Sequence, residues 1–297
     1  MQPEKENNLK DELADLKKAS AEYCSSCTRI ENFKYPKGVR LAVNFTVDFD
    51  AQLRRRLYNE PVMQLTKGEF GGRVGIWRLL DLFEKHDIKA TIFTVGRICE
   101  LYPESLKEAA KRGHEVANHM WEHRVPADIE LEKDHLSKAT TAIEQLCGKK
   151  PVGTRSRHKL SLLKEQGYIY TSHDVADNYP YYVTDAERQN WILNFPFHYV
   201  LDDAMYFNFG WVESDSAGQR LADPSKVYDI WASAFRQLYK TGSYMNVVLH
   251  AFISGRSLRI AMLDKLIQEM KKKPGVWFPT CEELARYCIE TFPPGLY

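Results

Sequence analysis

Two aspartates lie two residues apart at the end of an apolar stretch, NFTVDFDA, residues 44–51. Side chains alternate along a strand, so Asp48 and Asp50 share one face with Cα atoms about 6.5–7 Å apart. Because burying an unpaired carboxylate is costly, one aspartate could bind a metal ion while the other reaches over it. Taken alone, the stretch is equally consistent with a polar strand end whose carboxylates are solvated.

Two histidines lie four residues apart in HMWEH, residues 119–123, directly after the predicted strand HEVANH. Together with one aspartate, His119 and His123 supply the two nitrogens and one oxygen of a catalytic zinc site with open positions. Such a spacing also arises by chance in a chain with nine histidines. The glutamate is Glu122 and not the residue after His119, which disfavours the metalloprotease motif H-E-x-x-H.

His250 ends the apolar stretch MNVVLH, and Arg155 ends PVGTR. Histidine is suited to proton transfer near neutral pH, and an arginine next to a carboxylate favours its ionised form. A structural histidine and a surface ion pair are the alternatives. Like the aspartates and the histidine pair, both residues fall at the end of a predicted strand.

The elements that must position these residues alternate between strand and helix patterns. Apolar residues at every second position from Val39 to Phe49 predict a strand, and a capping box of Thr280 with Glu283 predicts the start of the last helix. Further strands are predicted at KATIFTV, HEVANH, PVGTR, WILNFP, YMNVVLH and GVWF. The alternation predicts a parallel sheet, closed as a barrel or open and doubly wound, without the G-x-G-x-x-G of dinucleotide-binding folds. In a barrel, catalytic groups lie at the C-terminal ends of strands.

The 297 residues carry a formal charge of +1 and no basic stripe, which argues against nucleic acid and membranes as partners and favours a small-molecule or saccharide ligand. The charged N-terminal stretch and the lack of any apolar run of about 18 residues predict a cytoplasmic protein. Residues 1–38 are expected to form an N-terminal extension that is irregular over residues 21–38. Six cysteines are too few for a disulfide scaffold, and Cys24 with Cys27 is interpreted as an incidental pair.

From about Val39 to Ile289 the chain resembles the polysaccharide deacetylase superfamily, also called the NodB homology or carbohydrate esterase family 4 fold. TVDFDA is similar to the first family motif, an apolar strand that ends in two aspartates. HMWEH is similar to the second, H-(S/T)-x-x-H, with Met120 at the usual serine or threonine. The third, fourth and fifth motifs resemble PVGTRSRHKLSLLKEQGYIYTSH, NFPFHYVLDDAMYF and VVLHAFISGRSLRIAMLDKLI. The branch indicated contains peptidoglycan-deacetylase-like proteins, cyclic imidases and a metal-independent allantoinase.

The resemblance implies a single α/β domain over residues 39–297, folded as a distorted (β/α)7-type, NodB-like barrel. It implies a divalent metal ion, Zn²⁺ in the first place, and these site residues: Asp50, His119 and His123 as metal ligands, Asp48 as general base, His250 as general acid, and Arg155 as the partner that keeps Asp48 ionised. The fourth motif supplies pocket residues in the family, so Asp202 and Asp203 are expected to bound the substrate groove. The branch also implies a homo-oligomer, a tetramer or a dimer.

The implied activity is metal-dependent hydrolysis of a non-peptide amide C–N bond, of N-deacetylase type. The alternative is a cyclic imide or ureide amidohydrolase, imidase-like or allantoinase-like, since the lack of an apolar leader favours a small substrate over an assembled cell wall. A third hypothesis is a non-catalytic carbohydrate-binding homologue, although all predicted positions hold competent residues. Ala251, Ser257 and the stretch SRHKLS, residues 156–161, depart from the family motifs and affect the expected substrate more than the catalysis.

Overall fold

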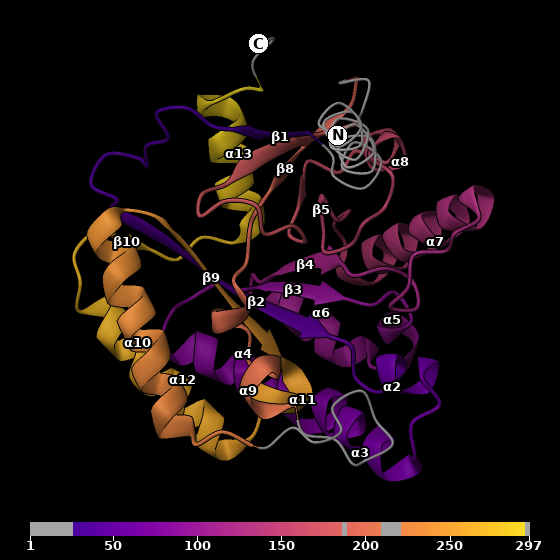
Figure 1. Ribbon diagram of the computed structural model, residues 1–297. Helices are drawn as coiled ribbons and strands as arrows, with labels where there is room; N and C mark the ends of the chain where they lie inside the picture. Colours follow the sequence, from indigo (N-terminus) through magenta and orange to yellow (C-terminus); the bar gives the residue numbers. More distant parts are fainter. Residues whose placement is uncertain (1–25, 186–188, 209–220, 295–297) are drawn as a thin grey trace, which may run out of the picture.

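The computed structural model describes residues 26–185, 189–208 and 221–294 (Figure 1). Its strands are β1 (Ser26–Arg29), β2 (Leu41–Phe49), β3 (Thr91–Thr94), β4 (Glu115–Asn118), β5 (Gly153–Thr154), β6 (Tyr170–Thr171), β7 (Tyr181–Thr184), β8 (Trp191–Asn194), β9 (Tyr244–His250) and β10 (Val276–Trp277). Its α-helices are α2 (Leu53–Leu57), α3 (Val62–Phe70), α4 (Ile76–Lys85), α5 (Ile98–Leu101), α6 (Pro103–Lys111), α7 (Ile129–Cys147), α8 (Leu160–Glu165), α9 (Ala204–Phe207), α10 (Pro224–Thr241), α11 (Ala251–Ser254), α12 (Ser257–Lys271) and α13 (Cys281–Thr291). A π-helix, η1 (Gly71–Gly75), joins α3 to α4, and a short 3-10 helix, η2 (Tyr199–Leu201), precedes α9.

The centre of the molecule is a curled sheet of parallel strands. In the order β9, β2, β3, β4, β5, β6, β8, each strand pairs in parallel with the next. β10 is parallel to the start of β2, and β7 and β1 extend the sheet beyond β8 in antiparallel fashion. In the described ranges β8 and β9 do not pair, and we call the gap between them the seam. The predicted distorted (β/α)7-type barrel is thereby confirmed.

Strand β2 is buried on both faces, as expected for a central strand of a parallel sheet. Its apolar residues from Leu41 to Phe49 join the largest apolar cluster, which also contains side chains of α4, α10 and α12. Helices α10 and α12 lie side by side in Figure 1 and cover this outer face near β9. The alternate positions Asn44, Thr46 and Asp48 therefore face the interior of the barrel.

The end of the chain follows the predicted pattern. The side chain of Thr280 accepts a hydrogen bond from the backbone N–H of Glu283, and the Glu283 carboxylate accepts one from Thr280 N–H at 2.7 Å. This capping box starts α13, as the sequence predicts. No helix within residues 26–185, 189–208 and 221–294 is both long and apolar enough to cross a membrane.

The segment before the barrel carries a strand that the sequence pattern misses. Residues 21–38 are predicted to be irregular, but β1 pairs antiparallel with β7, and Ile30 is buried in a second apolar cluster. The prediction is therefore wrong at β1, whereas the domain boundary at residue 39 stays a prediction. Cys27 lies exposed on β1, and Cys24 and the helix-prone residues 1–20 lie outside the described residues.

Candidate active site

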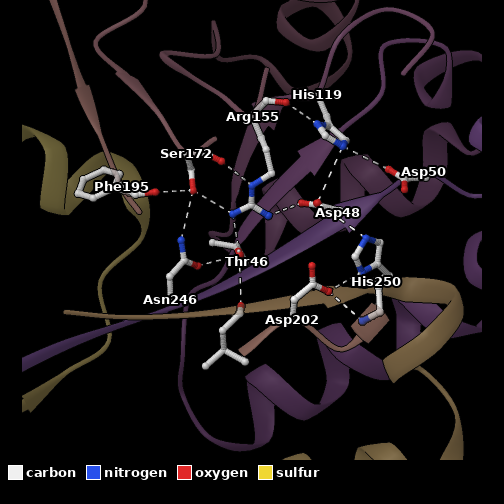
Figure 2. Close-up of polar contacts among 12 residues, drawn as sticks. Thr46, Asp48, Asp50, His119, Arg155, Ser172, Phe195, Asp202, Asn246 and His250 are labelled. Carbon is white, nitrogen blue, oxygen red and sulfur yellow. Dashed lines mark hydrogen bonds and ion pairs between the residues drawn. The ribbon is translucent and has the colours of Figure 1, made fainter. Parts of the chain in front are cut away.

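The six residues predicted to form the site lie together at the C-terminal ends of the parallel strands. Asp48 and His250 end the neighbouring strands β2 and β9, where they are register partners. The others follow strand ends: Asp50 after β2, His119 and His123 after β4, and Arg155 after β5. Figure 2 shows five of these side chains, from the C-terminal ends of β2, β4, β5 and β9, pointing toward one another. The positions agree with the rule that catalytic groups gather at this edge of a barrel.

Asp50, His119 and His123 form a compact group of possible metal ligands. Their ligand atoms all lie within 4.8 Å of one another. Nε2 of His119 is 3.6 Å from one carboxylate oxygen of Asp50, and Nε2 of His123 is 3.6 Å from the other. The histidines lie on a bent loop in which Met120 and His123 have φ of 70° and 60°, so the backbone turns sharply enough to bring both rings to one aspartate.

The chemistry of this group fits a divalent cation. Oδ1 of Asp50 is buried and has no hydrogen-bond partner in the described part of the chain. Nδ1 of His119 lies 2.6 Å from the backbone carbonyl oxygen of Arg155, so it carries the proton and leaves Nε2 free to bind. Burial lowers the pKa of His119, lowers that of His123 to about 4, and raises that of Asp50. Two imidazole nitrogens and one carboxylate oxygen within 4.8 Å of one another are a donor set of the kind that zinc binds.

The negative charge of Asp48 is balanced by an arginine of the protein itself. Its Oδ1 accepts a short hydrogen bond from Nη1 of Arg155, and both side chains are buried. Burial alone would raise the pKa of Asp48, but Arg155 and the neighbouring histidines outweigh burial and lower it. Oδ2 points elsewhere, 3.9 Å from Nε2 of His119 and 3.9 Å from Nε2 of His250. Asp48 is therefore an ionised carboxylate with one oxygen fixed and the other directed into the site.

His250 faces Asp48 with one nitrogen and a buried carboxylate with the other. Nδ1 donates to Oδ1 of Asp203 at 2.7 Å, and the backbone N–H of His250 donates to Oδ2 at 2.9 Å. Burial lowers the pKa of His250, but Asp203 and the other nearby carboxylates raise it to about 10. At neutral pH His250 is therefore a cation whose Nε2–H points toward the site.

Asp203 is the functional residue that sequence reasoning misplaces. The sequence predicts that Asp202 and Asp203 bound a substrate groove, whereas Asp203 is fully buried beneath His250 and also accepts a hydrogen bond from Ser254 Oγ at 2.5 Å. The backbone pairing of Asp202 with Val248 of β9 brings it there. The two adjacent acids are visible in the sequence, but the partner of Asp203 depends on this tertiary pairing.

Glycines of η1 let the loop after His250 approach closely. A Cβ added to Gly75 would lie 2.0 Å from the carbonyl oxygen of Ala251, and one added to Gly71 would lie 2.9 Å from the backbone nitrogen of Phe252. Neither backbone atom can move away as a flexible side chain could. The G-G-x-x-G sequence of η1 therefore fixes the depth at which α11 and His250 sit.

Comparisons with other proteins agree with this fold. The profile of the polysaccharide deacetylase family matches residues 69–170. A peptidoglycan deacetylase of Helicobacter pylori is 29% identical over 254 residues, covering 74% of this chain and 86% of that protein. A putative polysaccharide deacetylase of Schizosaccharomyces pombe is 25% identical over 306 residues, covering 86% and 92%.

Two solved structures show the same architecture. A putative polysaccharide deacetylase from Mycobacterium smegmatis superposes with a TM-score of 0.81 at 26% identity, over 92% of this chain and 99% of that one. An allantoinase superposes with a TM-score of 0.77 over 89% and 96%, and at 23% identity it shows a likeness of fold alone. The chain is therefore similar in sequence and in its NodB-like fold to proteins of the polysaccharide deacetylase superfamily. Relatives named deacetylases are hydrolases of non-peptide carbon–nitrogen bonds, which is the enzyme class that the sequence predicts.

Proposed function

We propose that this protein is a metal-dependent hydrolase of a non-peptide amide C–N bond, of N-deacetylase type. The observation that carries the proposal is the facing pair of Asp48 and His250, whose Oδ2 and Nε2 lie 3.9 Å apart beside the ligand group. One is ionised and the other protonated because their partners, Arg155 and Asp203, have opposite charges. Two titratable groups with oppositely shifted pKa values mark a base and an acid.

Asp50, His119 and His123 would hold the cation. A divalent cation bound there would supply Lewis-acid polarisation of the amide carbonyl and acidify a water molecule. Two imidazoles and a carboxylate suit zinc, which is the metal that we propose. The carboxylate of Asp50 is buried with its Oδ1 unpartnered in the described residues, so it would gain the most from such an ion.

The remaining chemistry is proton transfer by this chain's own residues. Oδ2 of Asp48 accepts the proton of the attacking water, while Arg155 on Oδ1 keeps the carboxylate ionised beforehand. Nε2–H of His250 then donates to the departing amide nitrogen, and Asp203 holds the other ring proton in place. Because Asp48 and His250 come from adjacent strands in register, their spacing is set by the sheet and not by a mobile loop.

An N-acetylated saccharide is the proposed substrate class. Support comes from the match of residues 69–170 to the polysaccharide deacetylase family and from the relatives that are named peptidoglycan or polysaccharide deacetylases. The same acid, base and metal ligands could open a cyclic imide or ureide, so this alternative is an arm of the test below. A cytoplasmic location and a homo-oligomer stay predictions, which fractionation and light scattering would check.

The test combines metal analysis with a substrate panel. We expect elemental analysis of the purified protein to find about one zinc per chain, chelation to abolish hydrolysis, and zinc to restore it. The panel compares N-acetylglucosamine oligomers with succinimide and hydantoin. Turnover of the cyclic compounds alone would replace the deacetylase proposal with the amidohydrolase alternative. Saccharide binding without turnover of any panel member would indicate a non-catalytic homologue.

A further inference from the structure

Besides its contact with Asp48, the guanidinium of Arg155 forms several other contacts inside the barrel (Figure 2). Its Nη2 donates to Oγ1 of Thr46 at 3.0 Å and to Oγ of Ser172 at 3.1 Å, and its Nε donates to the Ser172 carbonyl at 3.0 Å. Its Nη1 donates to Asp48, and the ring of Phe93 lies 4.2 Å from the guanidinium carbon. Arg155 is only 3% exposed, so water cannot supply these contacts.

Asn246 of β9 links the two hydroxyls that accept from Arg155. Oγ1 of Thr46 donates to Oδ1 of Asn246 at 3.0 Å, and Nδ2 of Asn246 donates to Oγ of Ser172 at 3.2 Å. A hydroxyl has one proton and two lone pairs, so the direction of its proton decides where its lone pairs point. An asparagine amide carries both an acceptor and a donor, so it can accept a hydrogen bond from one hydroxyl and donate one to the other.

The proton directions around Ser172 are fully determined. Its Oγ donates to the backbone carbonyl of Phe195 at 3.0 Å, and its lone pairs accept from Asn246 and from Arg155. The hydroxyl of Thr46 can donate either to Asn246 or to the backbone carbonyl of Val247, which lies at 3.2 Å. In both cases a lone pair of Thr46 faces Arg155. The contribution that only Asn246 makes is therefore its donation to Ser172.

Hydrogen bonds orient the side chain of Asn246 beside a cavity. Its side chain is 2% exposed but borders a cavity of about 400 Å³ in the seam between β8 and β9. Phe197, Leu201 and Tyr244 also line this cavity. Since no side chain presses on Asn246 from the cavity, its orientation depends on its polar contacts, which include the carbonyl of Pro196 at 3.4 Å.

We propose that Asn246 is a positioning residue that fixes the hydroxyl of Ser172. Through this hydroxyl it holds the guanidinium of Arg155 in the orientation that contacts Asp48. The role of Asp48 in this proposal rests on the proposed function, but the orientation of Arg155 by Asn246 does not. Asn246 touches neither the ligand group nor Asp48 in the described contacts, and it acts across the barrel from β9 to the end of β5.

The neighbouring strand offers a matched control. Asn44 of β2 is the register partner of Asn246 and is equally buried. Its Nδ2 donates to the carbonyl of Pro279 at 2.7 Å, and its Oδ1 accepts from the hydroxyl of Tyr244 at 2.7 Å. Among the described residues, Asn44 forms no hydrogen bond with Arg155 or with the hydroxyls that accept from it. Asn44→Leu therefore removes as much buried polarity as Asn246→Leu without disturbing the guanidinium.

The first experiment is a double-mutant cycle with Arg155→Lys. We expect Asn246→Leu to lower kcat on the order of tenfold with KM little changed when Arg155 is present, because partners of this kind typically contribute 10–100-fold. In the Arg155→Lys background the same change should have almost no further effect. Asn44→Leu should change kcat by the same factor in both backgrounds. An equal loss from Asn246→Leu in both backgrounds would make Asn246 merely structural and overturn the proposal.

The second experiment needs no substrate. Rotation about the Nε–Cζ bond of Arg155 is followed by ¹⁵N NMR of the guanidinium group in the folded, metal-free protein. We expect it to be at least about tenfold faster in Asn246→Leu, and unchanged in Asn44→Leu. If Asn246→Leu fails to fold, Asn246→Ala serves for both measurements. Faster rotation in a protein that turns over no substrate would uphold this proposal while the proposed function failed, and unchanged rotation would refute the positioning role.

Discussion

The two aspartates at the end of β2 have opposite surroundings. Asp48 meets the buried guanidinium of Arg155, and its pKa is lowered although burial alone would raise it. Asp50 is equally buried, its Oδ1 has no hydrogen-bond partner in the described residues, and burial raises its pKa. The protein thus supplies the positive charge for Asp48 and leaves that of Asp50 to be supplied from outside. This difference in surroundings is the physical reason for proposing Asp48 as the base and Asp50 as a metal ligand.

The histidines show the same contrast. His250 contacts the buried carboxylate of Asp203, and its pKa rises to about 10. Burial and the positive charge of a nearby arginine lower the pKa of His123 to about 4. One imidazole is therefore a proton donor, while the other is a neutral ligand at the same pH.

The largest expected effect tests the difference between Asp48 and Asp50. Asp48→Asn should lower kcat/KM by about 10²–10⁴-fold, the range for a lost general base, and leave the metal content unchanged. Asp50→Asn should abolish both activity and metal binding. Steady-state kinetics and elemental analysis of the two variants measure this. Activity that survives Asp48→Asn would show that the assigned base is wrong.

The second effect concerns stability on the Arg155 side. Arg155→Met leaves Asp48 buried and unpaired, and we expect it to lower the free energy of unfolding by about 3–5 kcal/mol. Arg236→Met is the control, since Arg236 forms an exposed ion pair with Glu269 at 2.8 Å and should contribute less than about 1 kcal/mol. Urea denaturation compares the two. Equal losses would mean that Asp48 finds another partner after the substitution.

The strand ends of this site are predictable from sequence. Alternating strands and helices imply a parallel sheet, and a parallel sheet places all C-terminal ends at one edge. Asp48, His119, Arg155 and His250 each end an apolar stretch or follow one, so their meeting follows from the pattern alone. Their division into ligands, base and acid is implied by the resemblance and stays a prediction.

The supporting residues are not predictable in the same way. Asp203 and Asn246 act through contacts with residues 47 and 74 positions away in the chain, respectively. Which side chains meet depends on register and on the seam, and neither leaves a periodic signal in one sequence. Strand β1 was missed for a related reason, because its four residues, SCTR, show no apolar alternation.

The third effect sharpens the histidine comparison. Asp203→Asn removes the main charge that raises the pKa of His250, so this pKa should fall from about 10 toward 6.5 or below. The alkaline limb of the kcat profile should move with it, and activity at pH 8 should fall about tenfold or more. Imidazole NMR and pH–rate profiles measure the shift. Ser254→Ala, which keeps the carboxylate, is the control and should change the limb little.

The sign of the His250 effect on stability follows from the same shift. Because its pKa in the folded protein lies above 6.5, protonated His250 stabilises the fold fully below about pH 6.5. This contribution is lost as the pH rises through about 10. Asp203→Asn should therefore flatten the decline of stability between these two pH values. A decline identical to that of the parent protein would assign it to another group.

The smallest expected effect is a gain in stability from Asp50→Asn, opposite in sign to the loss expected from Arg155→Met. In the metal-free protein, Asp50→Asn replaces a buried carboxylate that lacks a partner on Oδ1, so it should raise the free energy of unfolding at pH 7 by about 1 kcal/mol. The raised pKa of Asp50 means that this carboxylate destabilises the fold increasingly as the pH rises, so the gain should shrink in acid. Added zinc should raise Tm for the parent protein but not for the variant. A lower Tm for metal-free Asp50→Asn would show that the protein itself compensates Asp50, and the contrast with Asp48 would then fail.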